Sequence, residues 1–189
     1  MQRLYEHHKV LTYPRTDSRY IGSDIVPTIK ERLKACNIGP YKAYIPALLK
    51  APICTSKAFV DDKKVSDHHA IIPTEEYVQL DHMSNEERKI YDLVVRRFIG
   101  VLYPAYEYEQ TTMKATVQTS AKPSVATAVF GAKGQVVLKE GWKAVYDNLS
   151  LDEEEDDKSG DQLRLAGQQL PTLKKGQEVD ISQIMRSQG

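Results

Sequence analysis

The chain has 189 residues, of which 41% are hydrophobic and 28% charged, the composition of a globular protein with one large or two small domains. Lysine plus arginine and aspartate plus glutamate both number 26, and this zero net charge argues against a general nucleic-acid-coating protein, although not against a local cationic site. No apolar run approaches the ~20 residues of a membrane span, and two cysteines are too few for a disulfide framework, which favours a reducing cytosol.

The first segment, residues 1–6, has the pattern of a helix end. We expect the chain to be an excised fragment of a longer polypeptide with an added initiator methionine.

Residues 11–18, LTYPRTDS, place Tyr13 two positions before Arg15, and in extended backbone such residues point to the same side. Pro14 favours this geometry, since the residue before a proline is pushed away from the helical region.

This stretch suits chemistry on a phosphodiester. The phenol of Tyr13 is a possible covalent nucleophile, and the guanidinium fork of Arg15 matches two phosphate oxygens. Asp17 and Ser18 are interpreted as groups that orient Arg15 or cap the next helix. The alternative is that Tyr13 is an ordinary packing residue beside an arginine.

Two helices are predicted between this stretch and residue 51. Ser23 has the features of an N-cap, and the first helix should end at the breaker cluster of residues 37–40. Residues 41–51 predict a second, short helix that contains Pro46. The first helix has apolar residues at helical spacing, namely Ile25, Val26, Ile29 and Leu33.

A polar loop, residues 57–66, leads into a second motif, residues 67–74, DHHAIIPT. The adjacent histidines follow an acid and precede a short apolar run that ends in a proline. Neighbouring side chains of this kind point to different sides, so we expect one imidazole in a cleft and the other facing away. The alternative for either histidine is a structural residue with satisfied hydrogen bonds.

The helix predicted with the strongest signals follows this motif. Ser84 and Glu87 have the spacing of a capping box, and the helix should extend to Leu102, before Pro104. Its core-facing stripe is predicted to consist of Ile90, Leu93, Val94, Phe98 and Val101. The adjacent Arg96 and Arg97 are interpreted as part of a solvated face.

Beyond Pro104 the pattern becomes that of β-strands. Residues 106–118 alternate polar and apolar side chains, and two shorter strands are predicted on either side of a hairpin turn at residues 131–134. Residues 141–146 predict a turn or short helix with Trp142 as a core anchor. The acidic residues 150–161 predict a solvated loop, and the last strand is predicted at residues 178–184.

The two motifs, in this order and at this separation, closely resemble those of type IA DNA topoisomerases, the topoisomerase III branch in particular. Residues 4–6, 19–20, 61–65 and 141–142 resemble that branch as well. The resemblance implies that Tyr13 attacks a DNA phosphodiester and becomes linked to the 5′ phosphate, with Arg15 and His68 as further catalytic residues. It also implies DNA contacts by Arg15, Ser18, His68 and His69.

The resemblance further implies an α+β architecture. Residues 1–104 would form a mainly helical catalytic-tyrosine domain with a helix-turn-helix, catabolite-activator-like core, and residues 105–189 a mainly antiparallel β segment of an arch. In the intact enzyme a separate metal-binding domain, the toprim domain, supplies Mg²⁺. Nothing in this sequence resembles that domain, so we expect the fragment to bind no cofactor and to be inactive alone.

The expected partners are single-stranded DNA and the remaining domains of the full-length enzyme. We expect a bacterial, cytoplasmic, nucleoid-associated monomer with no membrane contact. The rival interpretation is a non-catalytic module that binds single-stranded DNA by stacking and a cationic groove. A scaffold that binds another protein is a third possibility, supported only by the neutral charge and the acidic residues.

Overall fold

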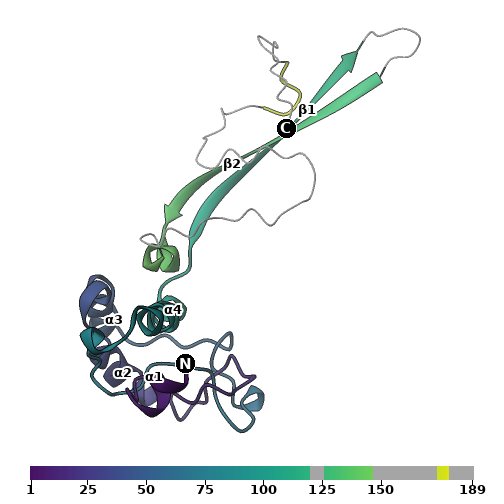
Figure 1. The fold of residues 1–189 in the computed structure, drawn as a ribbon. Coiled ribbons are helices and arrows are strands. Elements are labelled where there is room, and N and C mark those ends of the chain that lie inside the picture. The colour runs from purple at the N-terminus through teal and green to yellow at the C-terminus, as the bar shows by residue number, and fades with distance from the viewer. Residues whose placement is uncertain (120–125, 147–173, 179–189) are drawn as a thin grey trace. The chain divides into compact units, whose positions relative to one another are not determined.

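The computed structural model describes residues 1–119, 126–146 and 174–178. The described residues belong to two compact units (Figure 1). One contains residues 1–107 and 139–146, and the other contains residues 108–119 and 126–138. The predicted domain bounds, 1–104 and 105–189, stay a prediction.

Short helices open the first unit. The predicted helix end is α1, Gln2–Glu6. The predicted N-cap at Ser23 is wrong, because its backbone N–H and hydroxyl both donate to the Asp62 carboxylate, at 2.6 and 2.9 Å. A helical conformation begins only at a 3₁₀ turn, η1, which continues into α2. The elements up to residue 50 are η1 Val26–Thr28, α2 Ile29–Ala35, η2 Gly39–Ala43 and α3 Ile45–Lys50.

The long helix α4, Asn85–Leu102, begins at the predicted capping box. The Ser84 N–H donates to the Glu87 carboxylate at 2.8 Å, and the Glu87 N–H donates to the Ser84 hydroxyl at 3.3 Å. Two backbone donors that the helix itself cannot satisfy are thereby paired. The helix ends before Pro104, as predicted, with Tyr103 in extended conformation.

The predicted stripe of α4 is confirmed in part. Phe98 is buried, and Ile90, Val94 and Val101 are partly buried against the core. Two expectations are wrong: Leu93 is 64% exposed, and Arg96, which was expected in solvent, is buried. This arginine donates to the Asp92 carboxylate at 2.9 Å and to the Val145 carbonyl, so its charge is compensated inside the protein. The most buried apolar residues of the helix are Tyr91, Val95, Phe98, Ile99 and Leu102.

The 3₁₀ helix η5, Gly141–Val145, packs against α4. Trp142, the predicted anchor, is 40% exposed, and the fully buried residue of this element is Val145. Gly141 has φ +49°, and a Cβ there would lie 2.3 Å from the Ala105 carbonyl oxygen, so only glycine fits. The core that unites α1, α2, α3, α4 and η5 includes Leu4, Leu11, Ile29, Leu33, Ile45, Ile99 and Val145.

The second unit is a two-stranded antiparallel sheet of β1, Glu107–Thr119, and β2, Ala126–Lys139. The predicted turn at residues 131–134 is wrong, because β2 runs through it without a break. An exposed ribbon has no core face to fill, so glycines are tolerated there at modest cost. The connection at 120–125, the acidic residues 150–161 and the predicted last strand, apart from Glu178, lie outside the described residues.

Helices and an antiparallel sheet confirm the predicted α+β class and are compatible with the implied domain types. No helix in the described part of the chain is long and apolar enough to cross a membrane.

Candidate active site

The two sequence motifs pair as short antiparallel extended segments. Thr12 donates its N–H to the Ile72 carbonyl at 3.0 Å, and Thr74 donates to the Val10 carbonyl at 3.0 Å. Leu11, which forms a bridge with Pro73, is buried in the core. Apolar residues therefore anchor both segments, and the backbone ladder fixes their register.

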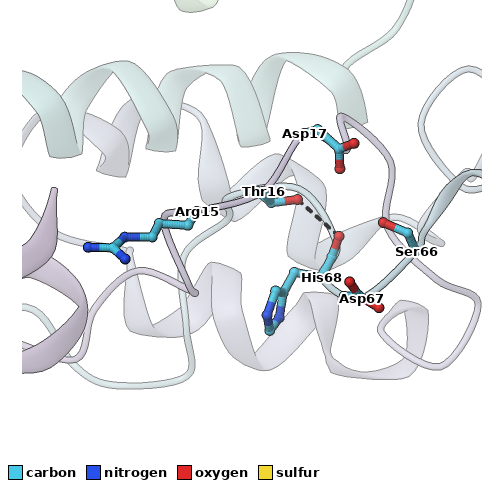
Figure 2. Close-up of a pocket in the computed structure, with 6 residues that line it drawn as sticks. All are labelled: Arg15, Thr16, Asp17, Ser66, Asp67 and His68. Carbon is cyan, nitrogen blue, oxygen red and sulfur yellow. Dashed lines mark hydrogen bonds between the residues drawn. The ribbon is translucent and has the colours of Figure 1, made fainter.

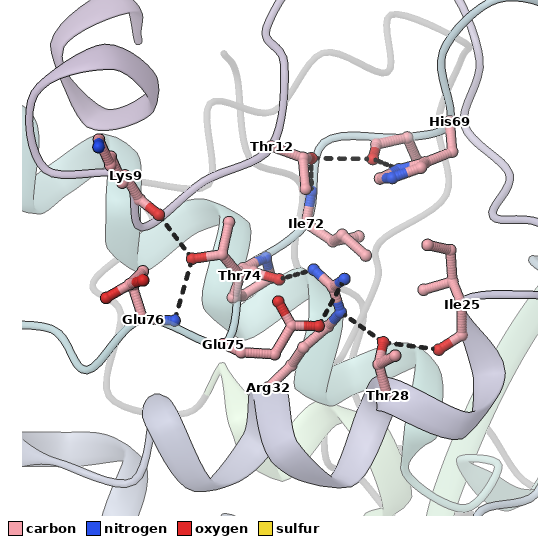
Figure 3. Close-up of polar contacts among 12 residues, drawn as sticks. Lys9, Thr12, Ile25, Thr28, Arg32, His69, Ile72, Thr74, Glu75 and Glu76 are labelled. Carbon is pink, nitrogen blue, oxygen red and sulfur yellow. Dashed lines mark hydrogen bonds and ion pairs between the residues drawn. The ribbon is translucent and has the colours of Figure 1, made fainter.

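Side-chain hydrogen bonds extend this pairing beyond the ladder. The Thr12 hydroxyl donates to the Ala70 carbonyl at 3.3 Å and accepts the Ile72 N–H at 3.0 Å (Figure 3). The Thr16 hydroxyl donates to the His68 carbonyl at 3.0 Å (Figure 2). Two segments more than 50 residues apart in the sequence are thus joined over most of their length.

This pairing brings Tyr13 and His68 together. Their ring centroids lie 4.3 Å apart, with the planes inclined by 44°. The ring of Tyr5 from α1 also meets Tyr13 edge to face, at 5.4 Å between centroids. Tyr13 is half-buried and His68 is exposed, so the phenol contacts two aromatic rings at the protein surface.

Arg15 lies at the surface beside this pair. It lines an open pocket of about 330 Å³ together with Thr16, Asp17, Ser66, Asp67 and His68. The chain bends at Pro14, and the guanidinium points away from the His68 ring (Figure 2). Within the described part of the chain, Arg15 has no hydrogen bond, ion pair or cation–π contact, so its donors are free for an anion.

Ser18 and His69, the other predicted DNA contacts, have partners within the protein. The Ser18 hydroxyl donates to the Lys64 carbonyl at 2.8 Å and accepts the Tyr20 N–H at 3.1 Å. A ring nitrogen of His69, Nδ1, lies 2.7 Å from the Ala70 carbonyl, and Nε2 has no partner among the described residues. Of the four predicted DNA contacts, Arg15 and His68 are the exposed ones.

A buried arginine that sequence reasoning missed supports the second motif from α2 (Figure 3). Arg32 donates to the Pro73 carbonyl and the Thr28 hydroxyl, each at 2.8 Å, and forms a 2.8 Å ion pair with Glu75. Burial lowers the pKa of Arg32, and the charge of Glu75 opposes that effect. The sequence did contain a signal for this burial, because Arg32 lies three residues after the buried Ile29 and therefore on the same face of the helix.

In the described part of the chain, no group of three or more histidine, cysteine, aspartate or glutamate side chains could hold a metal ion. Cys36 is buried, and its burial raises the thiol pKa to about 11. The residues described here therefore do not fit the Mg²⁺ that the family resemblance implies.

The similarity to known proteins extends over the whole of this chain. A family model described as DNA topoisomerase matches residues 1–189. The DNA topoisomerase 3 of Bacillus cereus (strain ZK / E33L) is 50% identical, and that of Bacillus subtilis (strain 168) is 46% identical. Each comparison covers all of this chain and 24% of the relative. The chain therefore belongs to the type IA DNA topoisomerases, in the topoisomerase III branch.

Proposed function

We propose that this chain carries the nucleophile of a topoisomerase that cleaves one DNA strand, lets another strand pass and religates the first. The observation that carries the proposal is the contact of the Tyr13 and His68 rings, 4.3 Å apart at the surface of a family member. In the proposed step a bond forms between the Tyr13 oxygen and phosphorus, and the bond from phosphorus to the 3′ oxygen breaks. The phenol loses its proton, and the departing oxygen gains one.

The roles of the other side chains are inferred from their charges. A phenol with a pKa of about 10 is mostly protonated at neutral pH and a poor nucleophile. We assign to Arg15 the stabilisation of negative charge on the phosphate and on the phenolate, because its donors are unpaired among the described residues. His68 is assigned proton transfer or a hydrogen bond to a phosphate oxygen. Since the linkage to Tyr13 replaces the broken ester, reversal needs no ATP.

We further propose that Mg²⁺ is held by other domains of the full-length enzyme. No cation site is formed by the described residues, so the chain of 189 residues alone should not cleave DNA. The proposed partners are single-stranded DNA and the remaining domains of a monomeric enzyme.

The decisive experiment uses the full-length enzyme and oligonucleotides labelled at one end. Attachment to the 5′ phosphate leaves a 3′ label on the protein and releases a 5′ label with a free 3′ hydroxyl. We expect Tyr13→Phe to abolish the adduct and to leave oligonucleotide binding within about twofold, because only one hydroxyl is removed. Tyr5→Phe, which changes the neighbouring ring in the same way, should retain the adduct.

The outcomes separate the two candidate functions. Single-strand binding without any adduct in the wild-type full-length enzyme would favour the non-catalytic module. An undiminished adduct in Tyr13→Phe would show that another residue is the nucleophile. Adduct formation by the 189-residue chain alone would refute the proposed need for the other domains.

A further inference from the structure

A cationic cluster lies just after the first motif and just before the second. Arg19 and Lys64 each donate to the Tyr20 hydroxyl at 3.3 Å. Both charges also lie near the face of that ring, at 5.4 Å and 4.6 Å from its centroid. Two cations from separate segments thus converge on one phenol.

The charges of this cluster are not balanced within the described part of the chain. Lys64 has a carboxylate 3.5 Å away, that of Asp61, but Arg19 has no acidic partner there. Hydrogen bonds from Arg19 and Lys64 lower the pKa of the Tyr20 hydroxyl, and the positive charges of the two side chains act in the same direction. Arg19 and Lys64 are exposed, so an anion from outside can reach both.

The cluster is fixed to the segments that form the candidate active site. The Tyr20 carbonyl accepts the Ala70 N–H at 2.8 Å, and the Ser18 hydroxyl holds the Lys64 carbonyl at 2.8 Å. Tyr20 follows Tyr13 by seven residues, a distance of at most about 25 Å even in fully extended chain. The cluster is therefore within reach of a strand that is bound at Tyr13.

We propose that Arg19 and Lys64 bind a second phosphate of the DNA strand, a few nucleotides from the one that Tyr13 attacks, with Tyr20 holding the two cations at a fixed spacing. This inference rests on the proposed function. A phosphate suits the cluster better than a single carboxylate, because it presents several oxygens to a guanidinium fork and an ammonium group. The site would position the strand without taking part in the chemical step.

The test is the salt dependence of binding of a single-stranded oligonucleotide to the full-length enzyme. Loss of one phosphate contact lowers the slope of log K against log salt by about 0.7. We expect this loss in the double variant Arg19→Gln with Lys64→Gln. The matched control is Lys63→Gln, which neutralises an exposed neighbour whose side chain has no contact among the described residues.

A second double variant separates charge from folding. Arg19→Lys with Lys64→Arg keeps both charges and should keep the wild-type slope. A slope in the neutral double variant equal to that of Lys63→Gln would overturn the proposal. So would a neutral double variant that binds poly-glutamate less tightly than the wild type does but keeps the wild-type salt slope for DNA, since that would assign the site to acidic peptides. A failure of the proposed function can be distinguished from these two outcomes, because the wild-type enzyme itself would then form no adduct.

Discussion

The hydroxyl of Thr16 donates to the backbone carbonyl of His68 at 3.0 Å, across 52 residues of sequence. The same oxygen accepts the Ser18 N–H at 3.1 Å. One side chain therefore fixes the turn that follows Arg15 and the backbone that carries the imidazole. Thr16 holds the geometry of the pocket although nothing in the proposed chemistry requires its hydroxyl.

We predict that Thr16→Val slows adduct formation in the full-length enzyme about fivefold, the equivalent of one net hydrogen bond of about 1 kcal/mol. Valine has nearly the same volume, so packing is retained while the donor is lost. The rate is measured in single-turnover experiments at saturating DNA, where binding does not limit. Thr16→Ser, which keeps the hydroxyl, should react at close to the wild-type rate, and equal rates for both variants would contradict the prediction.

The Arg32 network should be important for stability. Arg32→Met leaves the Pro73 carbonyl without the donor that it has in the structure, which costs about 2 kcal/mol. Arg32→Lys should restore only part of this, because one ammonium group cannot reproduce the three directions of the guanidinium. Urea denaturation of the 189-residue chain gives the free energies of unfolding.

The control for Arg32 is its carboxylate partner. The Glu75 side chain is 46% exposed, so water can replace the ion pair, and Glu75→Gln should cost less than about 1 kcal/mol. A loss in Glu75→Gln as large as that in Arg32→Met would show that the ion pair, and not the bond to the Pro73 carbonyl, stabilises the motif.

Local signals in the sequence predicted much of this structure. The capping box at Ser84 specified where α4 begins, because reciprocal bonds at a helix start depend on neighbouring residues alone. The proximity of Tyr13 and His68 followed from the family resemblance, and their roles stay predictions. The sequence alone did not reveal what tertiary packing decides: that Arg96 of α4 is buried while Leu93 is exposed, and that Ser18 and Arg32 bind backbone carbonyls of distant segments.

Arg96 and Arg97 form a natural matched pair on α4. Arg96 is 5% exposed and donates to Asp92 and to the Val145 carbonyl, whereas Arg97 is exposed. We predict that Arg96→Met lowers the free energy of unfolding by about 2 kcal/mol, since the Val145 carbonyl loses this donor and the Asp92 carboxylate keeps only the hydrogen bond from the Tyr41 hydroxyl. Arg97→Met should change it by less than about 0.5 kcal/mol. Equal effects in urea denaturation would contradict the buried role of Arg96.

The capping carboxylate of Glu87 should make stability depend on pH. Hydrogen bonding from the Ser84 N–H lowers the pKa of Glu87, and the charges of Arg3 and His8 act in the same direction. Because the pKa is lower in the folded chain, the carboxylate stabilises the fold above its unfolded pKa of about 4.3. This contribution is lost as the pH falls through the lower, folded pKa.

We therefore predict that Glu87→Gln destabilises the chain at pH 7 and that its deficit relative to the wild type shrinks as the pH falls below about 4.3. Glutamine can still accept the Ser84 N–H, so the variant removes the charge and keeps the cap. Urea denaturation midpoints across this pH range provide the measurement. Glu76→Gln, at an exposed side chain without a contact among the described residues, should show no such convergence. A constant deficit for Glu87→Gln at every pH would mean that the shape of the cap, and not its charge, stabilises the helix.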